Sequence, residues 1–491
     1  MTNLAKESKP YNMLQDKDIK KIQELKADYT PCRVSAEDIF SRFKALNLTK
    51  GLSHFNYFKQ RGYDFKMVLA ILVSMVVSPE KTVNSYLNKS IGKGTSMGKD
   101  VFYRLKNNPD ICWRMIMWHL VHCFLKVTSK DKDVDDTSSR YLIFDDTTLS
   151  KTGKRMEKIG KVWDHVTNNY VLGFKLLVMM YWDGKSSIPL DFSLHREKGR
   201  KQERPFGMTP KQIRKQYSRK RNKESYSAKR VDELDTNKIH MALRMFFTAI
   251  YRGLRVDYVL VDSWFTCDAL IQAVRSVTTQ TVHLIGMYKF AKTKFEYRGK
   301  SLTHAQINNM LGKHKRCRSL GYQYKQAVVM YQGVEISLFF SRRSKNDKWK
   351  VLLTTDTKLT FKKLIEHYQV RWIIEVFNRE SKQLLNLGGC QSSNFDAQVA
   401  ETTISMIAYL LLTLRMRYDN YESKGALYRS MNADMLRETL DKRLWGLFIE
   451  LICNVCEVLE MDADDLLKKM LVNSKTESMI LKLCYSMVKD E

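Results

Sequence analysis

Apolar residues recur at helical spacing through the first quarter of the chain. They predict helices at Ile39–Leu48, Phe65–Val77 and Trp113–Val127, because residues three and four positions apart share one helix face. Polar links such as SPEK and NKSIGKGTS separate these runs. We therefore expect residues 1–135 to be helical. They form either a DNA-binding domain, through their interleaved basic residues, or a structural cap.

The pattern then changes to short apolar runs that are typical of strands. The run Tyr141–Phe144 ends in two acids, Asp145 and Asp146, and the run Tyr258–Val261 ends in Asp262. Further strands are predicted at Tyr170–Trp182 and Ile188–Leu194, joined by an Asp183-Gly184 hairpin turn, and a helix at Asn237–Tyr251. Strands that alternate with a helix indicate an α/β sheet with acids at strand ends.

Residues 280–357 are rich in strand patterns (TVHLIGMY, KFEYRG, QAVVMYQGVEISLFF, KWKVLLTT), and we interpret them as an inserted β domain. One helix is predicted from Phe361 to about Asn386, with further helices at 396–416 and from 433 to the end. The expected organisation is a helical region (1–135), a core (136–279 and 358–416), the insertion (280–357), and a helical C-terminal region (417–491) to which we assign subunit pairing.

The net charge of the chain limits the classes of partner that it could bind. The 491 residues carry a formal net charge of +30, which points to a polyanion, with nucleic acid first and an anionic membrane second. The most apolar stretch, Ile404–Leu414, is too short to span a bilayer. No secretory signal is visible, and the nine cysteines, including the pair Cys453 and Cys456, are typical of reduced thiols. A cytoplasmic protein with no membrane partner is predicted, and without a GxxxxGK[ST] loop no nucleotide cofactor is expected.

The most basic stretch lies between the two aspartate strands. Residues Arg196 to Arg230 include fourteen lysines and arginines against three glutamates, with Phe206, Tyr217 and Tyr226 among them. Cations mixed with aromatic rings suit phosphate contact and stacking on bases. A solvated loop is the alternative, and the charge of the whole chain favours nucleic acid.

The helix around Glu375 presents a carboxylate between cations. At 100° per residue, Tyr368, Glu375, Lys382 and Arg379 all fall within about 80° of Arg371, while the apolar residues fall on the other side. An ordinary surface helix with an Arg371–Glu375 pair would give the same pattern.

The acids at the two strand ends change that interpretation. Asp145 (or its neighbour Asp146), Asp262 and Glu375 would repel one another if brought together, unless divalent cations lay between them. Carboxylates that leave room for water and phosphate suit Mg²⁺, with Mn²⁺ as a substitute. Two such ions can support in-line displacement at phosphorus, which is nuclease or strand-transfer chemistry.

Here the sequence resembles the DDE transposases of bacterial insertion sequences. Tyr368, Arg371, Glu375 and Lys382 fit their signature Y-x2-R-x3-E-x6-K, FDDTTLSKTGK (144–154) looks like their first aspartate block, and YVLVDSWFT (258–266) looks like their second. The resemblance spans roughly residues 141–415.

The resemblance implies a ribonuclease-H-like core, interrupted by a β-rich insertion. It also implies that Asp145, Asp262 and Glu375 hold two Mg²⁺ ions, while Tyr368, Arg371 and Lys382 contact phosphates. Asp146 remains the alternative to Asp145. An insertion-domain aromatic would stack on a flipped base, for which Trp349 is the candidate unless it belongs to the core; Trp372 and Arg379 are further DNA-contact candidates.

The predicted function is therefore a cut-and-paste transposase that acts as a homodimer on double-stranded DNA, both its terminal inverted repeats and its target. Such a protein would be cytoplasmic in a bacterium and bound to the nucleoid. A catalytically inactive, domesticated DNA-binding protein and a plain metal-dependent nuclease are the alternatives.

Overall fold

The computed structural model describes residues 62–78, 80–88, 97–129, 138–289, 292–418 and 423–429. The chain forms two compact units, the larger made of residues 39–81 and 98–430. Of the other unit, the structure describes residues 82–88, with helix α5 (Val83–Asn88), and Met97. The predicted helix Ile39–Leu48, the pair Cys453 and Cys456, and the predicted helices from 433 onward lie outside the described residues.

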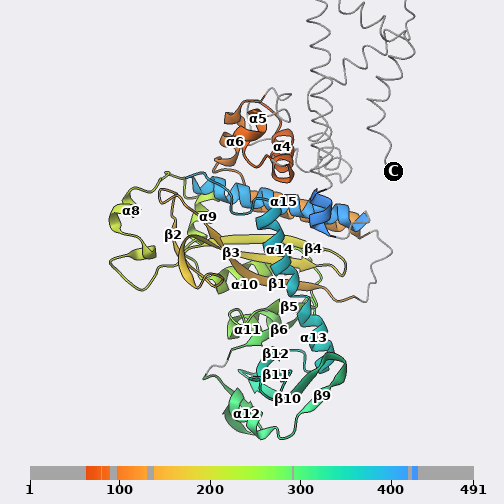
Figure 1. Cartoon of the computed structure of the whole chain (residues 1–491). Coiled ribbons are helices and arrows are strands. Elements are labelled where there is room, and N and C mark those ends of the chain that lie inside the picture. The colour runs from red at the N-terminus through yellow and green to blue at the C-terminus, as the bar shows by residue number, and fades with distance from the viewer. Residues whose placement is uncertain are drawn as a thin grey trace, which may run out of the picture. The chain divides into compact units, whose positions relative to one another are not determined.

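A twelve-stranded mixed sheet runs through this unit (Figure 1). The order along the sheet is β2-β3-β1-β5-β6-β12-β11-β10-β7-β8, with β4 paired to β3 and β9 paired to β10. The strands are β1 (Tyr141–Ser150), β2 (Gly160–Asp164), β3 (Asn169–Trp182), β4 (Ser187–His195), β5 (Tyr258–Val261), β6 (His283–Tyr288), β7 (Lys294–Tyr297), β8 (Lys300–Thr303), β9 (Lys315–Cys317), β10 (Tyr322–Tyr331), β11 (Val334–Arg342) and β12 (Lys350–Thr354). Strands β1, β5 and β6 are parallel neighbours, whereas the other pairings are antiparallel.

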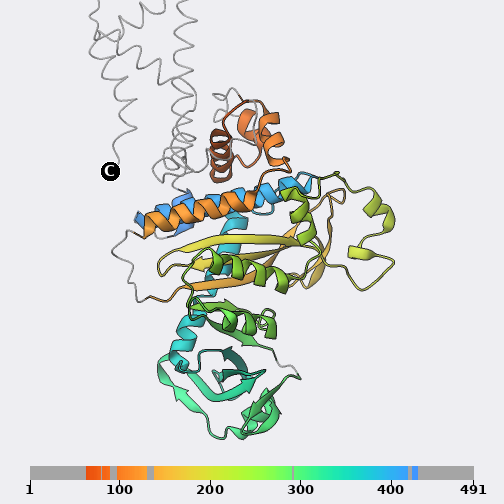
Figure 2. The ribbon, with the colours of Figure 1, turned by 180° about the vertical axis from the view of Figure 1, so that it is seen from behind.

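Helices lie on both faces of the sheet, and views from opposite sides show α14 on one face and α10 on the other (Figures 1 and 2). The helices of this unit are α4 (Phe65–Val77), α6 (Lys99–Lys106), α7 (Trp113–Thr128), α8 (Pro210–Arg214), α9 (Tyr226–Glu233), α10 (Lys238–Tyr251), α11 (Asp268–Ser276), α12 (His304–Met310), α13 (Phe361–Gln369), α14 (Trp372–Leu384) and α15 (Phe395–Tyr418). This arrangement of helices on a large mixed sheet is an α/β fold.

Helix α15 is the central helix of the core, and α4, α6 and α7 pack against it. Figure 2 shows α7 lying alongside α15. By length and composition α15 could cross a membrane, but 89% of its most apolar window is buried inside the protein. Such burial is what a core helix of a globular protein shows.

Several predicted elements are confirmed. Helix α4 and strand β5 have the predicted bounds, and α7 ends one residue later than predicted. The Asp183-Gly184 hairpin joins β3 to β4. Its Asp183 Oδ1 accepts hydrogen bonds from the backbone N–H groups of Lys185 (2.9 Å) and Ser186 (2.6 Å), and Gly184 has φ of +97°, which a residue with a side chain rarely adopts.

The predicted end of the first aspartate strand was wrong. Strand β1 continues past both acids to Ser150, because its polar half pairs with β3 from Asp145↔Val178 to Ser150↔Gly173. Backbone pairing needs no apolar side chain, so the end of the hydrophobic run does not end the strand.

Two further expectations need correction. The helix predicted from Phe361 to about Asn386 is two helices. The break falls at Val370 and Arg371, whose N–H groups bond to the carbonyls three residues back (both 3.1 Å), a tighter turn than that of an α-helix. The 280–357 segment does not stand apart from the core, because β6 pairs in parallel with β5 and β12 returns beside β6.

Candidate functional site

Asp145 and Asp262 lie side by side at the end of the parallel part of the sheet. Phe144 on β1 is paired with Val261 on β5, and each aspartate is the next residue along its chain. Neighbouring parallel strands are less than about 5 Å apart, so the two carboxylates occupy equivalent positions on adjacent strands. The Trp264 and Phe265 N–H groups donate to Asp262 Oδ1 (2.8 and 3.1 Å), which fixes that carboxylate at the start of a turn.

Arg371 connects Asp145 to Glu375. Its Nη1 lies 3.5 Å from Asp145 Oδ2, and its Nη2 donates to Glu375 Oε1. The short turn between α13 and α14 places Arg371 at the N-cap of α14, and Glu375 lies in the first helical turn. Asp145 and Glu375 are therefore joined through one guanidinium group, and Asp262 lies beside Asp145 on the neighbouring strand.

Asp145 is a buried acid close to a second negative charge. Burial and, after it, the negative charge of Asp262 raise the pKa of its carboxyl group to about 7, against the opposing effect of Arg371. The carboxylate of Asp145 is thus held where its negative charge is poorly compensated.

These residues fit a divalent cation in their chemistry. Hard oxygen donors suit Mg²⁺, and a cation beside Asp145 and Asp262 would relieve the repulsion that raises the Asp145 pKa. Among the described residues, no group of three or more His, Cys, Asp and Glu side chains is drawn together as metal ligands. Glu375 is linked to Asp145 through Arg371.

Asp146, the alternative first acid, faces the other way. Neighbouring residues of a strand point to opposite faces of the sheet. Asp146 forms ion pairs with Lys238 at the start of α10 and with Lys175 on β3 (3.6 Å). Its charge is therefore already balanced by two lysines, whereas Asp145 faces Asp262 and Arg371.

Tyr368 contacts the strand that ends at Asp262, and Lys382 contacts the strand that carries Asp145. The Tyr368 hydroxyl donates to the Val261 carbonyl (3.3 Å), directly before Asp262, and burial raises its pKa to about 12. Lys382 Nζ donates to Thr147 Oγ1 (2.6 Å), two residues after Asp145 on β1. Three residues of the Y-x2-R-x3-E-x6-K pattern, Tyr368, Arg371 and Lys382, thus contact the two strands next to which the aspartates lie. The fourth, Glu375, contacts Arg371.

The three remaining candidates lie at the surface or near it. Trp372 is 57% exposed at the first turn of α14, and Arg379 is exposed one turn beyond Glu375. Trp349 is not a core residue. It lies just before β12, half-buried between Arg342 (4.4 Å from the guanidinium carbon to the ring centre) and Lys325 (5.4 Å).

Sequence reasoning missed the cluster behind Asp146. Lys238 pairs with Asp146 and lies 4.1 Å from the ring centre of Trp264, an exposed side chain two residues after Asp262. The place of this tryptophan in VDSWFT was the available signal. The lysine comes from another element, and only the fold brings it there.

The basic segment 196–230 divides into two sets. Four of its fourteen cations pair with acids, Arg196 with Asp235, Arg219 and Arg221 with Asp396, and Arg230 with Glu233. Those four are the least exposed of the fourteen, and the other ten are exposed. The expectation that the whole segment contacts nucleic acid therefore needs correction, because its paired arginines hold the fold together.

Two family models match the chain. Residues 55–285 match the DDE superfamily endonuclease model, and residues 215–421 match the model of the archaeal putative transposase ISC1217. The curated proteins contain no match. Both family descriptions support a DNA-cleaving enzyme of the DDE transposase type, and the mixed sheet flanked by helices is consistent with a ribonuclease-H-like fold.

Proposed function

We propose that this protein is a transposase that binds the terminal inverted repeats of its own element and moves DNA by cut-and-paste cleavage and strand transfer. The observation that carries the proposal is the arrangement of Asp145 and Asp262 at equivalent positions of adjacent parallel strands, with Arg371 linking Asp145 to Glu375. The two family matches cover this whole region.

Asp145, Asp262 and Glu375 would hold the metal, two Mg²⁺ ions with Mn²⁺ as a substitute. When bound, the ions would lower the pKa of an attacking water or 3′-hydroxyl and stabilise the leaving oxygen. Enzymes of the DDE superfamily generally use divalent metals. The hard donor set and the raised pKa of Asp145 support this assignment.

The other residues of the site would position the DNA. Arg371 and Lys382 supply cations beside the acids, and Tyr368 supplies a hydroxyl at the end of β5. Charge-assisted hydrogen bonds to phosphate oxygens fix a backbone in register without reading its bases. Trp372 and Arg379 extend this surface along α14, while Trp349 would stack on a base from its place before β12.

The exposed positive charge of the chain indicates where it would hold DNA outside the site. The ten exposed cations of segment 196–230 would hold double-stranded DNA, and the net charge of +30 suits both terminal repeats and target DNA. A homodimer on paired ends would bring two sites together. We assign the protein to the bacterial cytoplasm, bound to the nucleoid.

The test uses purified full-length protein, Mg²⁺, and a plasmid that carries the gene with its flanking DNA. Paired breaks at inverted repeats are expected. Glu375→Gln should keep DNA binding and lose cleavage, because the neutral amide lacks the negative charge of a carboxylate ligand. Glu366→Gln is the matched control, since Glu366 is a partly exposed acid on α13 that pairs only with surface lysines in the described contacts.

The alternatives give different results in the same assay. Scattered cuts would favour a plain metal-dependent nuclease. Binding without cleavage in Mg²⁺ or Mn²⁺ would favour a domesticated DNA-binding protein. Cleavage that persists in Glu375→Gln would refute the assignment of the third acid.

A further inference from the structure

The exposed ring of Trp264 lies just beyond the two candidate aspartates. Strand β5 ends at Val261, opposite Phe144, while β1 continues to Ser150. The chain turns at Asp262, next to this free edge of β1, and Trp264 is two residues further on, with 43% of its surface exposed. Tryptophan is common where proteins contact partners, because one rigid ring offers a large contact area.

The turn that carries this ring is fixed to Asp262 itself. The N–H groups of Trp264 and Phe265 donate to Asp262 Oδ1 (2.8 and 3.1 Å), and the Asp262 carbonyl accepts from the N–H (3.2 Å) and the hydroxyl (2.7 Å) of Thr266. Phe265 is buried. Gly286 on β6 leaves room for the threonine, because a Cβ at that position would lie 2.2 Å from Thr266 Oγ1. The position of the Trp264 backbone is therefore coupled to that of a candidate metal ligand.

Two neighbours hold the Trp264 ring. The ring of Phe265 meets it edge-on, with 4.8 Å between the ring centres, and Lys238 Nζ lies 4.1 Å from its centre. Lys238 is held in turn by its ion pair with Asp146. A ring that is already ordered loses little conformational freedom when a ligand stacks on it. Trp264 is thus preorganised, and its exposed surface is accessible to a partner.

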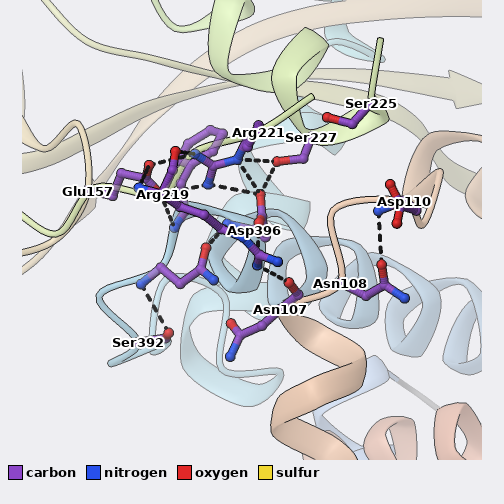
Figure 3. A network of polar contacts seen from close by, with 12 residues as sticks. Asn107, Asn108, Asp110, Glu157, Arg219, Arg221, Ser225, Ser227, Ser392 and Asp396 are labelled. Atoms are coloured by element: carbon purple, nitrogen blue, oxygen red, sulfur yellow. Dashed lines mark hydrogen bonds and ion pairs between the residues drawn. The ribbon is translucent and has the colours of Figure 1, made fainter. Parts of the chain in front are cut away.

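The aromatic rings of the basic segment are placed by other groups. Phe206 lies under Arg196, with 3.7 Å from the guanidinium carbon to the ring centre. Tyr226 lies between Ser225 and Ser227, which Figure 3 shows in the polar network around Asp396. Trp264, by contrast, is placed by Asp262. A strand whose phosphate lay at the aspartates would pass the turn that carries Trp264.

A ring at this position supplies a contact that the cations of the site do not. Arg371 and Lys382 suit phosphate oxygens, which repeat identically along a strand. A base that stacks on an aromatic ring fixes one nucleotide, and every base offers a face for stacking. Holding the nucleotide next to the reacting phosphate aligns that phosphate with the acids, and small errors in such alignment slow a reaction strongly.

We propose that Trp264 is a positioning residue that stacks on the base of a nucleotide joined to the phosphate that is cleaved. Lys238 orders the ring from one side, and the turn at Asp262 sets its distance from the acids. The inference rests on the proposed function, because that function places the reacting phosphate at Asp145 and Asp262.

The first test is photocrosslinking, which needs no cleavage. Duplexes that tile the DNA flanking the gene carry 5-iodouracil in place of single thymines, and Ca²⁺ replaces Mg²⁺, because it prefers the same oxygen ligands but binds them in a looser geometry. Peptide mapping should find Trp264 crosslinked most strongly from the positions beside the breaks found in the plasmid assay. Breaks at inverted repeats without a crosslink to Trp264 would overturn this inference alone. A crosslink to Trp264 without paired breaks would keep the stacking contact and refute the proposed function.

The second test separates positioning from a structural role. Trp264→Ala should lower the cleavage rate at saturating DNA by at least about fivefold, the size expected for one stacked base. Removing the base beside the break should slow the unaltered protein equally, but should slow Trp264→Ala further by less than about twofold, because ring and base act as one pair. Trp264→Phe keeps a ring and should regain most of the rate.

Tyr251→Ala is the matched control. Tyr251 is a 93% exposed ring at the end of α10 opposite Lys238, about 20 Å along the helix. This variant should cleave like the unaltered protein and should be slowed equally by the missing base. Losses from Trp264→Ala and from the missing base that multiply, or a Trp264→Phe variant as slow as Trp264→Ala, would overturn the proposal.

Discussion

Asp145→Asn is expected to stabilise the metal-free protein at neutral and alkaline pH although it should abolish cleavage. The pKa of this carboxyl group is raised from 3.8 to about 7 in the folded protein, first by burial and then by the charge of Asp262. The folded state therefore keeps a proton that the unfolded chain has released. An asparagine has no such proton to lose.

The sign of the effect follows from proton counting. Between about pH 4 and about pH 7 the folded state binds more protons than the unfolded state, so stability falls as the pH rises through this window and stays low above it. A shift of about three units corresponds to roughly 4 kcal/mol at about 1.4 kcal/mol per unit, as an order of magnitude. The side chain of Asp145 is 19% exposed, so solvent screens little of this cost.

The measurement is urea denaturation in EDTA at several pH values, followed by circular dichroism. The difference in unfolding free energy between Asp145→Asn and the unaltered protein should be small near pH 4 and grow to a few kcal/mol in favour of the variant by about pH 7. Asp262→Asn should make the fall of stability with pH shallower, because it removes the second cause of the shift. Curves that stay parallel across this window would refute the reasoning. Adding Mg²⁺ should restore stability to the unaltered protein and not to Asp145→Asn.

Lys382→Ala should lower the rate of cleavage at the DNA ends by at least about tenfold, more than it lowers overall DNA affinity. An equal fall in cleavage rate and affinity, or the same loss of cleavage in Arg379→Ala, would make Lys382 a general phosphate contact. Asp396→Asn should lower the unfolding free energy by about 3 kcal/mol, because it removes the buried carboxylate that Arg219 and Arg221 share, whereas Asp235→Asn, which breaks a more exposed pair, should cost less than about 1 kcal/mol; calorimetric unfolding of both variants compares them. Lys238→Gln should slow cleavage with little change in DNA affinity, since it removes a lysine that balances the charge of Asp146, the residue next to Asp145. A gel-shift assay beside the cleavage assay separates the two effects.

Local patterns predicted the elements whose stability is local. Helix α4 and strand β5 have the predicted ends, because apolar periodicity selects helix or strand directly. The break between α13 and α14 carried no such signal. No proline or glycine marks it, and the residues at Val370 and Arg371 keep right-handed helical dihedral angles while the hydrogen bonding tightens. The break leaves the apolar faces of the two helices nearly in line. The pattern of apolar and polar residues therefore does not reveal the change in backbone hydrogen bonding.

Long-range pairing explains what the sequence did not predict in the basic segment. Arg221 pairs with Glu157, 64 residues earlier, and with Asp396, 175 residues later. Although burial alone would raise it, the pKa of Glu157 is held below its usual value by the hydrogen bonds from Arg221. Composition counts all these cations alike, but folding removes the paired ones from the surface. The charge available to DNA is therefore carried by the ten exposed residues rather than by all fourteen.

The same limit applies to the choice between Asp145 and Asp146. Adjacent acids are equivalent in composition and differ only by the face of β1 from which they project. The fold gives Asp146 two lysines and gives Asp145 a second aspartate. Arg371 then contacts both Asp145 and Glu375, so the guanidinium group that the signature pattern assigns to phosphate also balances two of the candidate metal ligands. A Glu375 carboxylate paired with Arg371 has one oxygen committed, and release of that pair would free the acid and the arginine together. The two roles that the pattern assigns to separate residues are thus coupled through one ion pair.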